Sequence, residues 1–285
     1  MLRCLAPAKI NLVLEVLGKR DDGYHEIRSL VQTISLCDVL EFELADGIFL
    51  ECDEPSLETS DNLVIKAAEL LREISGLHKG ARIKLEKRIP WSAGLGGGSS
   101  DAAATLLALN KLWDLKLEAS NLAQMAAKLG SDVPFFIYGG AALMEGRGEK
   151  VTPLMTSPPA WFVLLVPPLP REPDKTRWLF ALLSRSNFTD GKYTDEAMRR
   201  WSQKKPLDST MFFNVFDRVA FGAFPGLVDY WRRFQEIGAK DIHLTGSGPA
   251  LFARVPDKSG AKRICGQVKQ EGLEAYAVSS VMPQV

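Results

Sequence analysis

A glycine-rich segment at residues 90–100 joins a predicted strand to a predicted helix, and it restricts the fold of this chain more than any other feature. Residues 82–89 alternate apolar and charged side chains, as a half-buried strand does. Residues 101–113 contain three consecutive alanines and a leucine stripe, which predict a helix. Glycines let a backbone approach a ligand closely, and the first turn of a helix offers unpaired N–H groups and a positive dipole end. The junction therefore predicts an anion site suited to phosphate.

This predicted phosphate loop comprises Pro90, Trp91, Ser92, Ala93, Gly94, Leu95, Gly96, Gly97, Gly98, Ser99 and Ser100. It is not a Walker A loop, because that motif needs a lysine and the loop has none. The dinucleotide pattern G-x-G-x-x-G also fails, since Ser99 stands at the last glycine position, and this argues against a dinucleotide oxidoreductase. A flexible loop before a capped helix is the alternative, but three consecutive glycines at such a junction favour a ligand site. The hydroxyls of Ser99 and Ser100 can contact a phosphate or its Mg²⁺.

Polar side chains interrupt a predicted N-terminal strand at residues 10–17, a segment rich in leucine and β-branched residues. Side chains alternate along a strand, so Lys9 and Asn11 are expected to share one face with Val13 and Glu15, opposite an apolar face. This pattern alone fits a solvated edge as well as it fits a binding cleft.

Three further segments are ambiguous on their own. Tyr24 and His25 follow a glycine turn and can stack and hydrogen-bond, although surface aromatics after a turn are the simpler interpretation. Asp132 follows a helix that is predicted to end at Gly130, and an aspartate at such a place is ordinarily a capping residue. The Gly-Ser-Gly-Pro segment at residues 246–249 joins two short predicted strands, which alone indicates a tight hairpin.

The chain has 285 residues, so we expect two domains, residues 1–155 and 156–285, with a single large α/β domain as the alternative. Pro153, Pro158 and Pro159 mark the expected boundary. In the first half strands are followed by helices, which indicates an α+β fold. The second half shows the order strand, helices, strand, strand, helix, strand, which is typical of a ferredoxin-like split βαβ unit.

Composition argues against several classes of protein. Basic and acidic residues both number 35, so the chain has no general electrostatic attraction to nucleic acid or to an anionic membrane. Its four cysteines are scattered and only three histidines occur, which argues against a zinc cluster and fits a reducing compartment. The N-terminus lacks signal-peptide features, and the longest strongly apolar run, residues 161–166, is too short to cross a bilayer. We therefore expect a cytoplasmic protein without nucleic-acid or membrane partners, as a monomer or a homodimer.

Taken together, these segments resemble the GHMP kinases, a family named for galacto-, homoserine, mevalonate and phosphomevalonate kinases. The phosphate loop is similar to the family's ATP loop, which wraps the phosphates without a P-loop lysine. Residues 130–136, G-S-D-V-P-F-F, and residues 244–250 resemble two further motifs of the family. The pairing of P-A-K-I-N-L at residues 7–12 with D-G-Y-H at residues 22–25 resembles those members whose acceptor is a cytidine diphosphate-linked methylerythritol.

The resemblance implies a two-domain α+β fold, with a nucleotide-binding N-terminal domain, a ferredoxin-like C-terminal domain and the active site in the cleft between them. It implies phosphorylation of the acceptor's 2-hydroxyl with ATP and Mg²⁺, a reaction of the non-mevalonate (methylerythritol phosphate) isoprenoid pathway. Lys9 and Asp132 would act at that hydroxyl, and the phosphate loop would hold ATP. By the same resemblance, the acceptor would be bound by Asn11, Tyr24, His25, Thr176 and Phe180.

Two alternatives accompany this interpretation. Another GHMP kinase, of the mevalonate or homoserine type, acts on a substrate that carries no base, so Tyr24 and His25 argue against it. A GHMP-fold protein that binds nucleotide without turnover would not need both Lys9 and Asp132.

Overall fold

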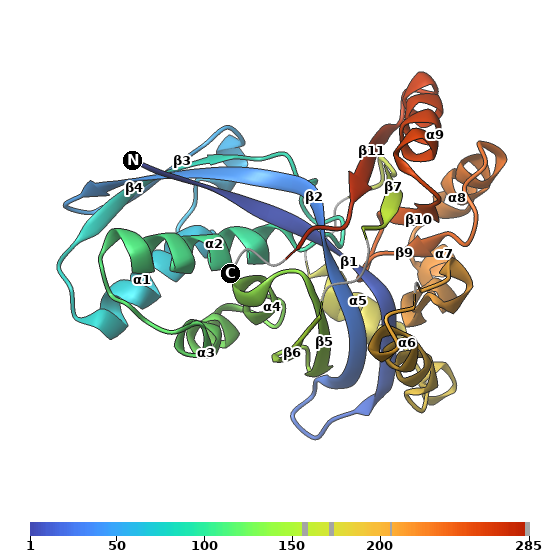
Figure 1. Cartoon of the computed structure of the whole chain (residues 1–285), viewed down its shortest axis with the longest axis horizontal. Helices are drawn as coiled ribbons and strands as arrows, with labels where there is room; N and C mark the ends of the chain where they lie inside the picture. The colour runs from blue at the N-terminus through green and yellow to red at the C-terminus, as the bar shows by residue number, and fades with distance from the viewer. Residues whose placement is uncertain (156–158, 171–173, 206, 283–285) are drawn as a thin grey trace.

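The computed structural model describes residues 1–155, 159–170, 174–205 and 207–282, and two β-sheets organise them (Figure 1). The first sheet contains β1 (Leu2–Lys19), β2 (His25–Ala45), β3 (Ile48–Cys52), β4 (Gly80–Glu86), β5 (Ala141–Gly146), β6 (Lys150–Leu154) and β8 (Phe213–Asn214). The second contains β7 (Trp161–Val166), β9 (His243–Leu244), β10 (Leu251–Val255) and β11 (Glu274–Ser279). The α-helices are α1 (Leu63–Ser75), α2 (Gly97–Leu112), α3 (Ala119–Leu129), α4 (Val133–Tyr138), α5 (Lys175–Leu182), α6 (Lys192–Ser202), α7 (Ala220–Ala223), α8 (Leu227–Glu236) and α9 (Lys258–Gln270). Short 3₁₀ turns occupy Pro55–Leu57, Arg185–Asn187, Ser209–Met211 and Val215–Arg218.

The first sheet is built on two long antiparallel strands, β1 and β2. Its strand order is β3-β4-β2-β1-β8, and β5 and β6 extend it from the other end of β2. Helices α1 to α4 lie against one face of this sheet, and α2 packs directly on β1 and β2 (Figure 1). The hydrophobic core between them includes Phe42, Leu106 and Phe135. This half therefore has the α+β architecture that the sequence predicts.

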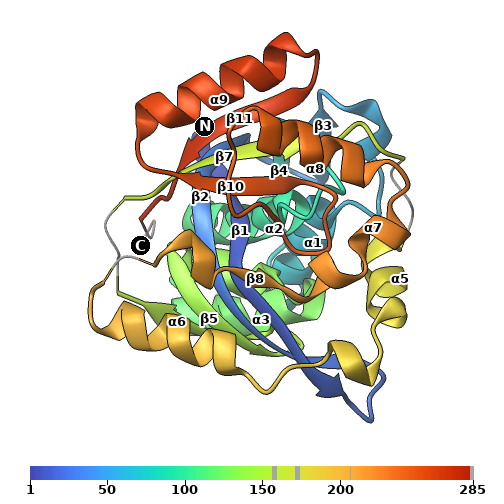
Figure 2. The same ribbon diagram turned by 90° about the vertical axis from the view of Figure 1, so that its right-hand side faces the viewer.

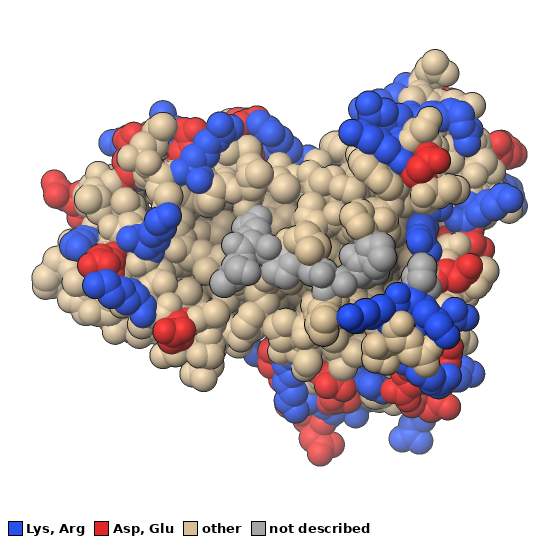
Figure 3. Space-filling view, viewed as in Figure 1, with Lys and Arg blue, Asp and Glu red and all other residues tan. Residues whose placement is uncertain are grey.

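The second sheet has the strand order β11-β7-β10-β9, and every neighbouring pair is antiparallel. In chain order this is 4-1-3-2, the arrangement of a ferredoxin-like unit. Helix α9 packs along β11 and β7, as Figure 2 shows. On the face shown in Figure 3, basic and acidic side chains both occur over the two halves of the molecule, in keeping with the balanced charge of the chain.

A separate hydrophobic core lies between the two sheets. Ile10 and Ile34 of the first sheet pack in it with Phe162 and Phe252 of the second. In addition, β8 from the C-terminal half pairs in parallel with β1. The two halves thus share buried surface and backbone hydrogen bonds. The expected boundary near residue 155 stays a prediction, and Pro158 lies outside the described residues.

Strand β1 departs from the simple alternation that was expected of it. Its pairing with β2 shifts at Leu12, which makes this residue a β-bulge. Lys9 and Leu14 consequently line the same cleft. Glu15 does not line this cleft. It is fully buried against α6, where it accepts hydrogen bonds from the backbone N–H and the hydroxyl of Thr194. The expectation that Glu15 shares a face with Lys9 is therefore wrong, because one extra residue reverses the alternation.

Helix α2 begins earlier than residues 101–113 suggest. Its N-cap is Gly96, with φ of 73°, and Gly97 is its first residue. The second half of the predicted phosphate loop is therefore the first turn of the helix. This places the unpaired N–H groups of α2 inside the glycine-rich segment itself.

Candidate active site

A cleft of about 1120 Å³ brings the two halves of the chain together around the start of α2. Its walls contain Lys9, Asn11, Tyr24, His25, Asp132, Thr176, Phe180 and residues 90–99. Ser100 is not among the residues that line this cleft. Its side chain is buried within α2, and its hydroxyl has no hydrogen-bond partner among the described residues. The cleft thus collects the residues predicted for the site, with that one exception.

The phosphate loop exposes backbone rather than side chains where α2 begins. A Cβ atom built on Gly98 would meet only one described atom, Leu63 Cδ1 at 3.9 Å, so the space over this residue is open. Gly97 is tighter, since its Cβ would lie 3.1 Å from Ile89 Cγ2. A helix start with open space over Gly98 can receive an anion on its N–H groups.

The Gly-Ser-Gly-Pro turn supports the phosphate loop from the C-terminal half. Gly94 has φ of 87°, and a side chain there would overlap the carbonyl oxygen of Thr245. The Thr245 hydroxyl donates to the carbonyl of Gly94 at 3.2 Å, and the Ala250 N–H donates to the carbonyl of Ala93 at 3.2 Å. The backbones of two distant segments therefore touch, which requires glycine at residue 94.

Lys9 and Asp132 form an ion pair on the cleft wall, with 3.6 Å between Nζ and Oδ2. Lys9 is 5% exposed and donates to Asn11 Oδ1 at 2.6 Å, while Asn11 donates to Ser29 Oγ at 2.8 Å. Burial lowers the pKa of Lys9, and the Asp132 carboxylate opposes that change. Asp132 precedes α4, but its side chain makes no capping hydrogen bond. Its carboxylate instead faces Lys9 and the cleft.

Aromatic side chains gather at the other end of the cleft. The rings of His25 and Phe180 stack with centroids 5.0 Å apart and planes 23° apart. Tyr24 is half-exposed, and the Arg147 guanidinium lies over its ring, 4.9 Å from the centroid. Burial and the nearby Lys19 ammonium lower the pKa of His25, so its imidazole is mainly neutral at pH 7 and has one donor and one acceptor nitrogen. Such a group can stack on a planar base and hydrogen-bond to its edge.

Thr176 lies where helix α5 meets the turn of the C-terminal half. Its hydroxyl is 3.0 Å from the hydroxyl of Ser247, so this pair joins α5 to the turn. Thr176 therefore lines the cleft with its hydroxyl already in a protein contact.

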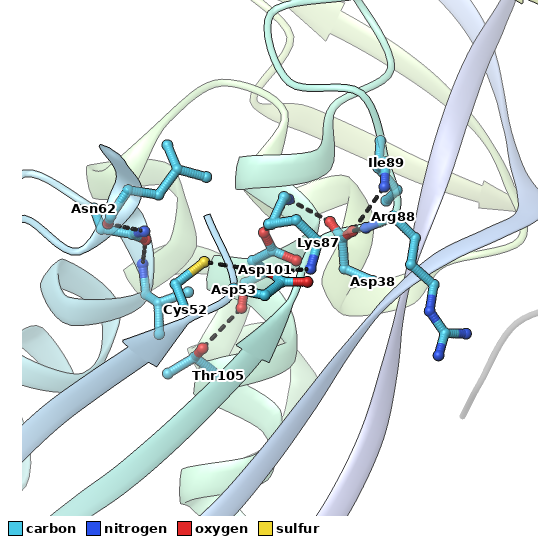
Figure 4. A network of polar contacts seen from close by, with 11 residues as sticks. Asp38, Cys52, Asp53, Asn62, Lys87, Arg88, Ile89, Asp101 and Thr105 are labelled. Atoms are coloured by element: carbon cyan, nitrogen blue, oxygen red, sulfur yellow. Dashed lines mark hydrogen bonds and ion pairs between the residues drawn. The ribbon is translucent and has the colours of Figure 1, made fainter. Parts of the chain in front are cut away.

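A buried network beside the phosphate loop was not foreseen from the sequence (Figure 4). The Lys87 ammonium pairs with the carboxylates of both Asp38 and Asp101, the latter at 2.8 Å. Asp38 also accepts the backbone N–H groups of Arg88 and Ile89, at 2.6 and 2.8 Å. The network thereby fixes the strand end, where the phosphate loop begins, to the first turns of α2.

The charges in this network do not balance, since two carboxylates share one ammonium. Burial raises the pKa of Asp101 to about 8, although Lys87 acts in the opposite direction. Burial also disfavours the charge of Lys87, but Asp101 and Asp38 outweigh it and raise the pKa of this lysine. One carboxylate oxygen of Asp101 has no hydrogen-bond partner among the described residues. Nothing in the sequence distinguishes Lys87 from the solvated charges of an alternating strand, so it was missed.

No group of three or more His, Cys, Asp or Glu residues in the described part of the chain is arranged to hold a metal ion. Over the same residues, none of the helices has both the length and the apolar character that a bilayer crossing requires.

Two family models match this chain, one in each half. The model described as "GHMP kinases N terminal domain" matches residues 62–140, and "GHMP kinases C terminal" matches residues 196–274. A 4-diphosphocytidyl-2-C-methyl-D-erythritol kinase from Dehalococcoides mccartyi is 48% identical over 99% of this chain and 99% of its own length. A protein of the same description from Bacillus cereus is 40% identical over 96% of this chain and 94% of its own length.

Solved structures of kinases also match this chain. A crystal structure of 4-(cytidine 5'-diphospho)-2C-methyl-D-erythritol kinase matches with a TM-score of 0.83 and 35% identity, over 98% of both chains. A homoserine kinase from Cytophaga hutchinsonii matches with a TM-score of 0.75 and 19% identity, over 99% of this chain and 95% of its own. The second likeness concerns the fold alone.

Proposed function

Since this chain belongs to the GHMP kinase family, we propose that its cleft transfers the γ-phosphate of ATP to the 2-hydroxyl of 4-diphosphocytidyl-2-C-methyl-D-erythritol. The chain is an ATP-dependent small-molecule kinase, and its reaction belongs to the methylerythritol phosphate route to isoprenoids. One observation carries the assignment of the site. A single cleft contains a helix start for phosphate, the Lys9–Asp132 pair and the aromatic group around His25.

The phosphate loop would bind the triphosphate through backbone N–H groups at the start of α2. Phosphoryl transfer demands little covalent help from a protein, so most of the catalysis is positioning and stabilisation of charge. The contact between Gly94 and Thr245 contributes to positioning, because it holds the phosphate loop in place. The Lys9 ammonium and the N-terminal end of the α2 dipole would stabilise the negative charge of the phosphates.

Asp132 would orient the attacking 2-hydroxyl and accept its proton as the oxygen–phosphorus bond forms. The bond between the γ-phosphorus and the β–γ bridging oxygen breaks in the same step, and ADP leaves. Lys9 beside Asp132 would place a positive charge next to the carboxylate and next to the attacking hydroxyl. Asn11 holds the Lys9 ammonium in place through its own hydrogen bond to Ser29.

The cytosine of the acceptor would bind against the aromatic residues. Tyr24 and Phe180 offer ring faces, and the neutral imidazole of His25 offers hydrogen-bonding nitrogens to the edge of the base. The Thr176 hydroxyl lies on the adjoining wall.

Mg²⁺ would enter with ATP. Because the described residues contain no ready-made cage of carboxylates and histidines, the ion would be held mainly by phosphate oxygens and water, a common mode for this metal. When bound, it would neutralise negative charge that develops on the phosphates.

An ADP-release assay over four conditions tests this function: the cytidine diphosphate-linked acceptor, mevalonate, homoserine, and no acceptor. ADP release should depend on the first compound alone. Release with mevalonate or homoserine instead would assign the cleft to another kinase of the family. ATP binding without ADP release under all four conditions would indicate a nucleotide-binding protein without turnover.

A further inference from the structure

Lys175, the first residue of α5, is a buried cation in the cleft, and the proposed mechanism gives it no role. It is 5% exposed. Its ammonium donates to the carbonyl oxygen of Ser92 at 2.6 Å and to the carbonyl oxygen of Gly248. Ser92 belongs to the phosphate loop and Gly248 to the turn of the C-terminal half. One side chain therefore links both glycine segments of the site.

These two hydrogen bonds fix the orientation of peptide groups in both segments. A peptide unit is planar, so a carbonyl that is held by Lys175 also sets the direction of the N–H on the other side of the same unit. For the Ser92 carbonyl, that N–H belongs to Ala93 in the phosphate loop. The other contacts that hold the loop act further along it, at the carbonyls of Ala93, Gly94 and Leu95.

Lys175 also adds charge to this part of the cleft. The ionisable group that most affects it is Lys9, whose side chain reaches the cleft from β1 and is itself paired with Asp132. The phosphate loop and the turn at residues 245–249 contain no charged side chain, and the charged neighbours on its own segment are Asp174 and Arg177. Burial, with a smaller contribution from Lys9, lowers the pKa of Lys175 to about 7. An anion bound beside it would raise that value again.

We propose that Lys175 is a positioning residue for phosphoryl transfer: it ties the phosphate loop to the C-terminal turn and adds its own positive charge to the triphosphate site. This inference rests on the proposed kinase function, but it concerns the ATP half of the cleft. Binding of ATP should therefore recruit a proton to Lys175 at a pH where the lysine is mostly neutral in the nucleotide-free protein.

The first experiment compares Lys175→Met and Lys175→Gln with Lys262→Met, a substitution of an exposed lysine on α9. Hydrogen bonds from a charged donor justify an expected rise in KM for ATP of about 10–100-fold in Lys175→Met. KM for the acceptor should stay within about twofold, because the aromatic end of the cleft is untouched. Lys175→Gln keeps a donor without the charge, and it should recover only part of the ATP affinity. Lys262→Met should match the wild type.

The second experiment measures proton uptake on ATP binding by calorimetry at pH 8, in buffers with different ionisation enthalpies and without acceptor. The wild type should take up about half a proton or more per ATP, and Lys175→Gln should lose most of that uptake. Asp101 also titrates in this range but is present in both proteins, so the difference between them reports on Lys175.

Three results would overturn the inference: equal losses of ATP and acceptor affinity in Lys175→Met, unchanged affinity for ATP, or equal proton uptake in wild type and Lys175→Gln. If neither variant folds, the uptake is measured in Asp101→Asn, in which that carboxyl no longer titrates: uptake there would support the inference, and its absence would overturn it. The calorimetry needs no acceptor, so it gives its answer even if the proposed acceptor is wrong. Failure of the proposed function would instead appear as missing turnover with intact ATP binding.

Discussion

The ammonium of Lys9 lies 3.6 Å from a carboxylate oxygen of Asp132, and the two groups differ sharply in exposure. The side chain of Lys9 is 6% exposed and that of Asp132 is 39% exposed. The positive charge is therefore held inside the protein while the negative charge meets the cleft. This asymmetry suits a carboxylate that must reach a substrate hydroxyl in the cleft.

Asp132→Asn should lower kcat while leaving ATP affinity nearly unchanged. The substitution keeps the shape of the side chain but removes the charge that accepts the proton, and such groups typically contribute about 10²–10⁴-fold. Steady-state kinetics together with an ATP titration provide the measurement. Asp114→Asn, at an exposed aspartate that does not line the cleft, is the matched control. Turnover of Asp132→Asn close to that of the control would show that Asp132 has no chemical role.

Gly98→Ala should weaken ATP binding without harming the fold. The added methyl group has open space in the protein, so only a bound phosphate would collide with it. Overpacking of this kind typically costs enough to lower affinity about 5–100-fold. Gly266→Ala, at a helical glycine of α9 with nothing near it, controls for the change in helix propensity. Equal ATP affinity for the two variants, with both melting temperatures unchanged or raised, would remove Gly98 from the phosphate site.

His25→Ala and Tyr24→Ala should differ in how they affect base selectivity. Stacking on a ring face contributes about 1–3 kcal/mol and tolerates any base, so Tyr24→Ala should weaken cytidine and uridine acceptors alike. A hydrogen bond to the edge of the base separates cytosine from uracil, and a mismatch there costs about 1–3 kcal/mol. The wild type should prefer the cytidine acceptor, and His25→Ala should erase much of that preference. The measurement is the ratio of kcat/KM for the two acceptors, and an unchanged ratio in His25→Ala would mean that this residue does not read the base.

Asp101→Asn should stabilise the protein at pH 8 more than at pH 5. Burial raises the folded-state pKa of Asp101 to about 8, so the favourable contribution of its bound proton is complete below the ordinary carboxyl value and is lost as the pH rises toward 8. Asparagine does not ionise, so the variant does not lose this stability as the pH rises. Melting temperatures of variant and wild type at the two pH values test this, and the difference should grow by about 2 °C or more toward pH 8.

Asp38→Asn is the contrasting variant for that experiment. Asp38 accepts two backbone N–H groups and pairs with Lys87, so this substitution should destabilise the protein at both pH values. A stability difference for Asp101→Asn that does not change between pH 5 and pH 8 would contradict the assignment of a raised pKa.

Much of the fold was predictable because its signals are local. The alternation in β4, the leucine stripe of α2 and the order of elements in the C-terminal half can each be read from neighbouring residues. The start of α2 at Gly97 could not be read in this way, since glycine disfavours helix and only the packing around the loop overrides that preference. The bulge at Leu12 was equally hidden, because it depends on the pairing of β1 with β2.

The residues of the candidate site also fall into those that the sequence indicated and those that it did not. Lys9, Asp132 and the aromatic residues were identified by resemblance to a family, while their residue types alone left simpler interpretations open. Lys87 and Lys175 were missed because their partners are carboxylates and carbonyls remote in the sequence. An isolated lysine in a sequence carries no sign that it will be buried.

The hydrophobic core shared by the two sheets has a consequence for how the molecule unfolds. A chain cut near residue 155 would leave Ile10 and Ile34 facing water, and β8 would lose its partner strand. Both fragments would expose apolar surface that is buried in the whole chain, so the halves are not separable modules in spite of their different architectures. Heating should accordingly produce one cooperative transition, in which the active site and both sheets are lost together.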